Sequence, residues 1–173
     1  SKIYNSKWVL ERTIRDHSLR IDCAKFKEKS NFLSTACQNV MKCNCADTLR
    51  GIEGEAASIY FSVFNDMILQ QKADFVFTTR NRRPPTDNVN AMLSFAYTLA
   101  TGMCTSALES VGVDPYVGFL HTDRPGRRSL ALDLVEEFRA VMCDRFVLTL
   151  INKKMISEKD FEKRENGAVT MTD

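Results

Sequence analysis

The amino-acid sequence predicts a mainly α fold: a single helical bundle domain that ends in a short β-hairpin. Apolar residues recur at helical spacing along most of the chain, whereas strand signals are limited to residues 75–77 and 161–173. With 173 residues, 44% of them hydrophobic and 27% charged, the chain can bury a core of its own without disulfides. It contains no internal repeat and no low-complexity linker.

The periodicity predicts helices over residues 2–16, 19–28, 31–44, 47–70, 88–111, 129–155 and 157–162. The fifth of these helices follows Asp87, a natural N-cap, and ends before Gly112 and Pro115. The terminal hairpin is expected to turn at Asn166 and Gly167, since this dipeptide favours tight two-residue turns.

The fifth helix is long enough to cross a bilayer, because residues 88–108 contain no charged side chain. Asparagine, serine and threonine recur throughout it, which makes the segment too polar for a lipid core. The sequence therefore predicts a central helix buried within the bundle and no membrane partner.

Glu53 is the most informative side chain of the fourth helix. Its row on that helix is otherwise apolar and comprises Ala57, Tyr60 and Phe64. Glu55 lies on a polar face instead and is expected to face solvent. Burying a bare carboxylate is costly, so Glu53 needs either a metal ion or an ion pair inside the core. Gly51 and Gly54 flank it at helical spacing, which fits the close approach of a ligand or of another helix.

A second group of candidate ligands surrounds the start of the sixth helix. Ser129 is a plausible N-cap, and Asp133 and Glu136 lie about one turn apart on one face. His121 precedes this helix at the end of an apolar stretch. Taken singly, His121 fits a core histidine and the acidic pair fits a solvated face with Glu136 paired to Arg139. The conjunction of these side chains with Glu53 favours a site for a divalent metal.

Four segments carry a resemblance to a known family. They are Ile-Glu-Gly at residues 52–54, Arg-Arg-Pro-Pro-Thr-Asp-Asn-Val-Asn-Ala-Met-Leu-Ser-Phe-Ala-Tyr at 82–97, Gly-Phe-Leu-His at 118–121, and Ser-Leu-Ala-Leu-Asp-Leu-Val-Glu-Glu-Phe-Arg at 129–139. In these segments, and over nearly its whole length, the chain closely resembles the helical domain of the CRISPR-associated integrase, the first-numbered protein of that system. It is similar to the branch found with type I-C loci.

The resemblance implies a set of site residues. The metal-binding glutamate of the family falls on Glu53, its histidine on His121 and its last acidic ligand on Glu136, with a further acidic residue at Asp133. Some members have Asp in place of Glu136, so this chain departs there in side-chain length. We expect Asp133 to orient the imidazole, because a metal-bound histidine usually needs an acceptor for its second nitrogen.

The resemblance also implies an activity and partners. The expected reaction joins new spacer DNA to a CRISPR repeat by transesterification, in which a 3′-hydroxyl attacks a phosphodiester; with water the same site would act as a DNA endonuclease. The expected partners are double-stranded DNA (prespacer and repeat), a second copy in a homodimer, and the second-numbered CRISPR-associated protein. The expected location is cytoplasmic, and six cysteines without a signal peptide agree with reduced thiols.

Two features predict that the chain is the catalytic part of a larger, two-domain protein. It has no initiator methionine, and residues 161–173 stop just after the second strand of the hairpin. The family resemblance implies an N-terminal β domain and further sequence after residue 173, so this part alone is expected to be catalytically incomplete.

Hard carboxylate oxygens with one imidazole suit Mg²⁺ or Mn²⁺, which are the expected cofactors. The net charge is only +2, but six arginines gather in two loops and could position DNA phosphates without reading sequence. They are Arg80, Arg82, Arg83, Arg124, Arg127 and Arg128. Ordinary solvated charge is the alternative for both loops.

Two other classes of function remain open. An unrelated metal-dependent nuclease would have the same ligands but would not need a 3′-hydroxyl substrate. A non-catalytic helical DNA-binding module would keep Glu53 in an ion pair and bind no metal. A zinc scaffold through Cys43 and Cys45 is a third alternative, although the sequence offers no second pair of ligands at suitable spacing.

Overall fold

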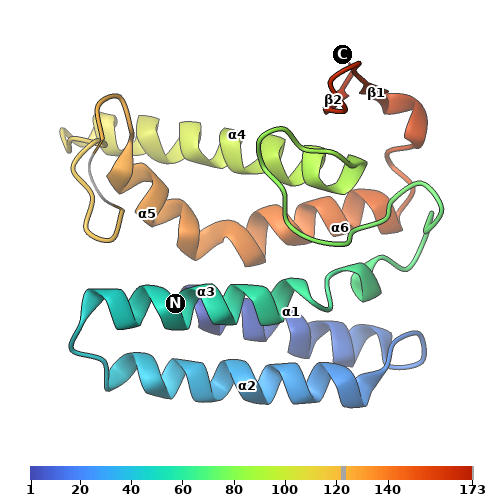
Figure 1. The fold of residues 1–173 in the computed structure, drawn as a ribbon, viewed down its shortest axis with the longest axis horizontal. Coiled ribbons are helices and arrows are strands. Elements are labelled where there is room, and N and C mark those ends of the chain that lie inside the picture. Colours follow the sequence, from blue (N-terminus) through green and yellow to red (C-terminus); the bar gives the residue numbers. More distant parts are fainter. Residues whose placement is uncertain (122–123, 173) are drawn as a thin grey trace.

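The computed structural model describes residues 1–121 and 124–172. Helices dominate it, and the two strands lie at the end of the chain (Figure 1). The α- and π-helical elements are α1 (Lys2–His17), α2 (Cys23–Met41), α3 (Ala46–Phe61), α4 (Asn88–Ser110), α5 (Ser129–Phe138), η2 (Arg139–Asp144) and α6 (Arg145–Asn152). The short elements are the 3-10 turns η1 (Asn65–Met67) and η3 (Glu158–Asp160) and the strands β1 (Phe161–Lys163) and β2 (Val169–Met171).

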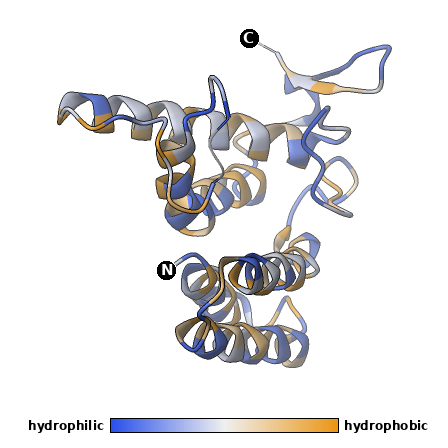
Figure 2. Cartoon of the chain, turned by 60° about the vertical axis from the view of Figure 1, so that its left-hand side comes forward, coloured by the Kyte–Doolittle hydropathy of each residue, from blue (hydrophilic) through white to orange (hydrophobic). Residues whose placement is uncertain are grey.

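The helices form two layers. Helices α1, α2 and α3 make one layer, and α4 with the continuous rod α5–η2–α6 makes the other (Figure 1). The turned view in Figure 2 keeps the two groups apart, so their separation is not an effect of one projection. The core between and within the layers includes the fully buried Leu10, Phe26, Phe64, Leu93 and Ile151. The mainly helical prediction is confirmed.

The boundaries of the early helices differ from those predicted. Residues 19–28 and 31–44 do not form two helices, because α2 runs unbroken from Cys23 to Met41 and begins at Asp22, whose carboxylate accepts hydrogen bonds from two backbone N–H groups. The helix expected over residues 47–70 ends at Phe61. Beyond it the chain forms the 3-10 turn η1, where the backbone N–H of Ile68 donates to the carbonyl of Asn65.

The predicted helix over residues 129–155 is a rod of three parts. Its middle, η2, is a π-helical turn, a feature that is rare and occurs often at functional sites. The rod ends at Asn152, and residues 157–162 form η3 and the start of β1 rather than a helix. The hairpin is confirmed: Phe161 pairs with Met171, and the turn uses Gly167 at φ 79°.

Residues 75–77 do not form the predicted strand. Phe75 and Phe77 are buried and Val76 is exposed, so the alternation was real. The backbone N–H of Phe77, however, bonds the side-chain oxygen of Asn65 at 2.9 Å instead of a neighbouring strand. Alternating burial alone therefore misled the prediction.

Helix α4 is buried mainly in its first half, and in its second half only Thr105 is buried. Its N-cap, Asp87, accepts a hydrogen bond from the backbone N–H of Asn90 at 2.8 Å, as predicted. In its second half Leu99 and Met103 are more than half exposed, so α4 is only partly buried and departs from the predicted central helix buried within the bundle. By length and composition alone α4 could span a membrane, and 33% of its 18-residue apolar window is buried inside the structure. The helix packs against α5, η2, α6 and β2.

Candidate metal and nucleic-acid site

Three separate segments of the chain meet at one cavity of about 240 Å³. The start of α1, the middle of α3 and the middle and end of α5 supply its walls, together with the loop before α5. The cavity brings together Glu53, His121 and Glu136, the three ligands expected from the sequence, although they lie up to 83 positions apart. Its lining is completed by Lys2, Arg50, Leu120, Arg127 and Asp133.

Asp133 holds the loop that carries His121. One oxygen, Oδ1, lies 2.6 Å from Nδ1 of His121 and accepts the backbone N–H of that residue at 3.1 Å. The other, Oδ2, accepts the N–H groups of Phe119 and Leu120 at 2.7 and 3.0 Å. Burial opposes the charged carboxylate, but the bonds from the imidazole and the three amides lower the pKa of Asp133. With Nδ1 engaged, Nε2 is the ring nitrogen left for a metal ion.

Gly118 allows this loop to lie directly on α5. A Cβ built at Gly118 would come within 2.6 Å of the Ser129 Cβ and within 3.0 Å of Oδ2 of Asp133. No larger residue fits without moving the loop. The glycine in Gly-Phe-Leu-His therefore sets the position of His121.

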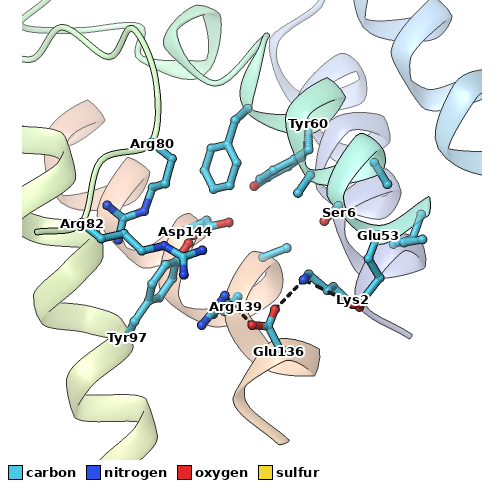
Figure 3. Close-up of a pocket in the computed structure, with 15 residues that line it drawn as sticks. Lys2, Ser6, Glu53, Tyr60, Arg80, Arg82, Tyr97, Glu136, Arg139 and Asp144 are labelled. Atoms are coloured by element: carbon cyan, nitrogen blue, oxygen red, sulfur yellow. Dashed lines mark hydrogen bonds and ion pairs between the residues drawn. The ribbon is translucent and has the colours of Figure 1, made fainter. Parts of the chain in front are cut away.

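Glu53 and Glu136 meet the ammonium group of Lys2. Nζ of Lys2 lies 2.7 Å from Oε2 of Glu136 and 3.7 Å from Oε1 of Glu53 (Figure 3). Glu136 is also paired with Arg139 at 2.5 Å and its side chain is only 13% exposed, so it does not lie on a solvated acidic face. Glu55 is exposed, as predicted, whereas Glu53 is partly buried.

The space beside Gly51 and Gly54 is open. A Cβ at either position would have no atom of the described chain within 4 Å, apart from the helix itself. Tight helix packing therefore does not explain these glycines, and they leave the backbone of α3 beside Glu53 accessible.

A network of buried polar groups adjoins Glu136. The hydroxyl of Tyr97 donates to Oδ1 of Asp144 at 2.5 Å, and the guanidinium groups of Arg139 and Arg80 lie 4.7 and 5.3 Å from the centre of the Tyr97 ring. Burial raises the pKa of Asp144 to about 6. Figure 3 shows Arg139 beside Glu136 and Tyr97, so it connects the candidate ligand to the network.

This network lines a second, smaller cavity of about 60 Å³, which shares Lys2, Glu53 and Glu136 with the first. Among the described residues, four buried side-chain atoms lack a hydrogen-bond partner, and all four belong to residues that line it. They are the Tyr60 hydroxyl, Nε of Arg80, Nε of Arg139 and Oε2 of Glu136, whose contact with Lys2 is an ion pair only. These buried polar atoms without a hydrogen-bond partner are thus concentrated beside Glu136.

The donor set fits a hard divalent cation, although the side chains are not arranged around one. Within residues 1–121 and 124–172, no three His, Cys, Asp or Glu side chains are close enough to share a metal ion. Lys2 supplies the positive charge between the two glutamates instead. Two carboxylates and an imidazole with its second nitrogen already engaged are nevertheless the ligand types that Mg²⁺ and Mn²⁺ accept.

The six loop arginines occupy different environments. Arg80 is turned inward and donates to Asn90 at 2.7 Å and to Ser94 at 3.1 Å. Arg127 lines the larger cavity and Arg82 the smaller one. The remaining three, Arg83, Arg124 and Arg128, are exposed.

Several residues of the site could not be recognised from the sequence. Lys2 and Arg50 lie at helix positions with no distinctive motif, and only the packing of α1 and α3 against α5 brings them to the cavity. Tyr97 and Asp144 are 47 positions apart. Asp144 could have been suspected, because it interrupts an apolar run, as Glu53 does.

The zinc alternative gains no ligands from the structure. The Cys43 thiol donates to the Cys45 carbonyl at 3.1 Å, and both cysteines are free. Neither residue belongs to a cluster of three potential ligands in the described part of the chain.

Comparison with known sequences identifies relatives over the full chain. The family described as CRISPR associated protein Cas1 matches residues 1–173. The chain is 50% identical over 172 residues to CRISPR-associated endonuclease Cas1 1 of Chlorobaculum tepidum, covering 99% of this chain and 50% of that protein. It is 44% identical over 172 residues to CRISPR-associated endonuclease Cas1 of Leptospira interrogans, covering 99% and 67%. The chain thus spans half to two thirds of the length of these relatives.

Solved structures share the fold. A casposase bound to integration product has 31% sequence identity and a TM-score of 0.75, with 99% of this chain and 45% of that chain covered. A Cas6-RT-Cas1–Cas2 complex has 26% identity and a TM-score of 0.82, with 99% and 18% covered. The family match over every residue and the identity to curated relatives agree with this fold, and the chain belongs to the Cas1 family.

Proposed function

We propose that this chain is the catalytic part of a DNA integrase and endonuclease of CRISPR adaptation, with its site at the cavity of Glu53, His121 and Glu136. One observation carries the proposal: three candidate ligands from distant segments line the same cavity, and an orienting carboxylate already holds the histidine. The relatives named as Cas1 endonucleases and the casposase bound to integration product support the reaction class.

The residues take distinct roles in this reaction. Glu53, Glu136 and Nε2 of His121 would hold Mg²⁺ or Mn²⁺, which would polarise the phosphodiester and activate the attacking hydroxyl. Asp133 fixes the imidazole, and Arg139 fixes one oxygen of Glu136. Arg50 and Arg127 line the same cavity and would bind the DNA phosphates next to the reacting one.

The proposed partners follow from the relatives. Double-stranded DNA, as prespacer and as CRISPR repeat, is supported by the casposase structure, and the Cas2 protein by the Cas1–Cas2 complexes. A homodimer, a further β domain, a cytoplasmic location and the type I-C branch are also proposed. They rest on the family resemblance in the sequence.

A non-catalytic DNA-binding module is the second candidate. The ion pairs of Lys2 with Glu53 and Glu136 favour it, because they neutralise both carboxylates without a metal ion. This candidate predicts that DNA binds but that no strand is cut or joined.

A strand-transfer assay separates the two candidates. A branched DNA carrying a free 3′-hydroxyl at the junction is incubated with the full protein that contains this chain, in Mn²⁺. The integrase proposal predicts that the 3′-hydroxyl attacks the phosphodiester at the junction, which rejoins the duplex strand and releases the branch. This reaction should be lost in Glu53→Ala and kept in Glu55→Ala, whose side chain is exposed on the same helix. No rejoining by the unmodified protein would favour the non-catalytic module. Equal rejoining by both variants would show catalysis that does not need Glu53 and would refute the site.

A further inference from the structure

A third cavity, of about 290 Å³, lies between the C-terminal part of α1 and α6. Four of its lining residues carry guanidinium or ammonium groups and one carries a carboxylate. The basic residues are Arg12, Arg20, Arg145 and Lys153, and the acidic one is Asp16. The whole chain has a net charge of only +2, so positive charge is concentrated at this cavity.

The single carboxylate does not neutralise this cavity. Its Oδ2 accepts from Nε of Arg12 at 3.1 Å and its Oδ1 from Nε of Arg15 at 3.0 Å, so both oxygens are engaged. Arg20, Arg145 and Lys153 form no ion pair with any residue of the described ranges.

Two of the cations are held close to the same aromatic ring. The guanidinium groups of Arg12 and Arg145 lie 5.4 and 5.3 Å from the centre of the Trp8 ring. Burial and the neighbouring Arg12 charge lower the pKa of Arg145. Because the ring holds two like charges near one another, an anion in the cavity would relieve their repulsion.

The basic cavity is aligned with the candidate metal site along α1. The α1 residues at the two sites follow one helical row, Lys2, Ser6, Val9, Thr13 and Asp16. Eleven residues separate Lys2 from Thr13, which corresponds to about 16 Å of helix. At 3.4 Å per base pair, this distance is about five base pairs of duplex DNA.

We propose that this basic cavity binds phosphates of a DNA backbone about five base pairs from the phosphate that reacts at the Glu53 cavity. The proposal rests on the proposed function, which supplies the DNA. Arginine and lysine bind phosphate through charge and hydrogen bonds, so the cavity adds affinity and orientation without reading sequence. It would make the reaction depend on duplex length on one side of the junction.

Salt-dependent DNA binding tests the proposal. Fluorescence anisotropy of a labelled 30-base-pair duplex is measured with this chain at several salt concentrations. Arg20→Gln and Lys153→Gln are chosen first, because both side chains are exposed and their removal leaves the packing intact. Each is expected to weaken binding and to make the slope of log K against log salt less negative by roughly 0.9 for each phosphate that the variant no longer neutralises. Arg145 is the half-buried basic residue of the cavity, and Arg145→Gln tests it, with Arg145→Lys as the variant that keeps the charge.

Lys27→Gln and Lys159→Gln are the matched controls, since they remove the same charge from exposed positions outside the cavity. An unchanged slope in Arg20→Gln and Lys153→Gln, or the same change in the controls, would overturn the proposal. An unchanged slope in a chain that still binds DNA refutes the basic cavity alone. If the unmodified chain binds no DNA, the proposed function fails as well, so the two failures are distinguishable.

A length series and a competitor complete the test. The binding affinity of the full protein is compared for branched DNAs whose duplex extends three or twelve base pairs past the junction. The longer arm is expected to bind more tightly, and this advantage should disappear in Arg20→Gln. Equal binding of both arms would refute a DNA site. Displacement of the long arm by millimolar inorganic phosphate would assign the cavity to free anions instead.

Discussion

Lys2 places a positive charge where the candidate site needs a cation. Its ammonium contacts both Glu53 and Glu136, whose carboxylates would otherwise repel each other in a partly buried cavity. An incoming divalent ion must therefore compete with Lys2 for the same oxygens.

Lys2→Met is expected to tighten Mn²⁺ binding about tenfold while lowering the stability of the metal-free chain. Removing the ammonium frees both carboxylates, but it also leaves their repulsion unbalanced, at a cost of roughly 1–3 kcal/mol. Titration calorimetry and thermal unfolding measure the two effects. Lys7→Met, on the same helix and outside the cavity, is the control. Weaker Mn²⁺ binding in Lys2→Met would show that Lys2 supports the site rather than competes for it.

Asp144 predicts a pH dependence of stability. Burial raises its pKa from 3.8 to about 6, so the folded chain holds this proton more tightly than the unfolded chain. The stabilisation from the bound proton is complete below pH 3.8 and is lost as pH rises through 6. It amounts to about 3 kcal/mol.

Asp144→Asn removes this titration and keeps an oxygen that can accept from Tyr97. Between pH 4 and pH 7 the variant should therefore gain up to about 3 kcal/mol in free energy of unfolding relative to the unmodified chain. Denaturant unfolding across that range measures the difference, with the exposed Asp74→Asn as control. A difference that stays constant with pH would rule out the titration of Asp144.

At the scale of elements, the loop before α5 is fitted to that helix by Gly118. Gly118→Ala is expected to push the loop away from Ser129 and to break the contact between His121 and Asp133. Mn²⁺ affinity should fall at least tenfold, and the imidazole resonances of His121 should shift in the NMR spectrum. Gly54→Ala is the contrast, since its Cβ meets open space and should stabilise α3 by about 1 kcal/mol. Unchanged His121 resonances in Gly118→Ala would contradict this account.

Sequence pattern predicted the elements well where a local signal marks them. Asp87 and the Asn-Gly turn fixed the start of α4 and the hairpin, because capping and turn chemistry act over a few residues. The end of α3 at Phe61 and the π-helical turn have no such local signal. They depend on packing between layers, which periodicity does not contain.

At the scale of the whole molecule, the site exists only where the two layers meet. Lys2 and Glu53 come from the α1–α3 layer, and Asp133 and Glu136 come from the other layer. The family resemblance placed the ligands at Glu53, His121 and Glu136, and the structure brings them to one cavity. It could not indicate that Lys2 pairs with both glutamates, because those contacts require the assembled layers. The pairing of Glu136 with Arg139, three positions along the same rod, was an alternative that the sequence offered.

The proposed chemistry depends on a divalent metal ion in the Glu53 cavity, and Mn²⁺ titration calorimetry on this chain measures its binding. We expect saturable binding that is lost in Glu53→Ala and His121→Ala and retained in Glu55→Ala, with the fold of each variant verified by circular dichroism. Binding that persists in both Glu53→Ala and His121→Ala would contradict the assignment of the site.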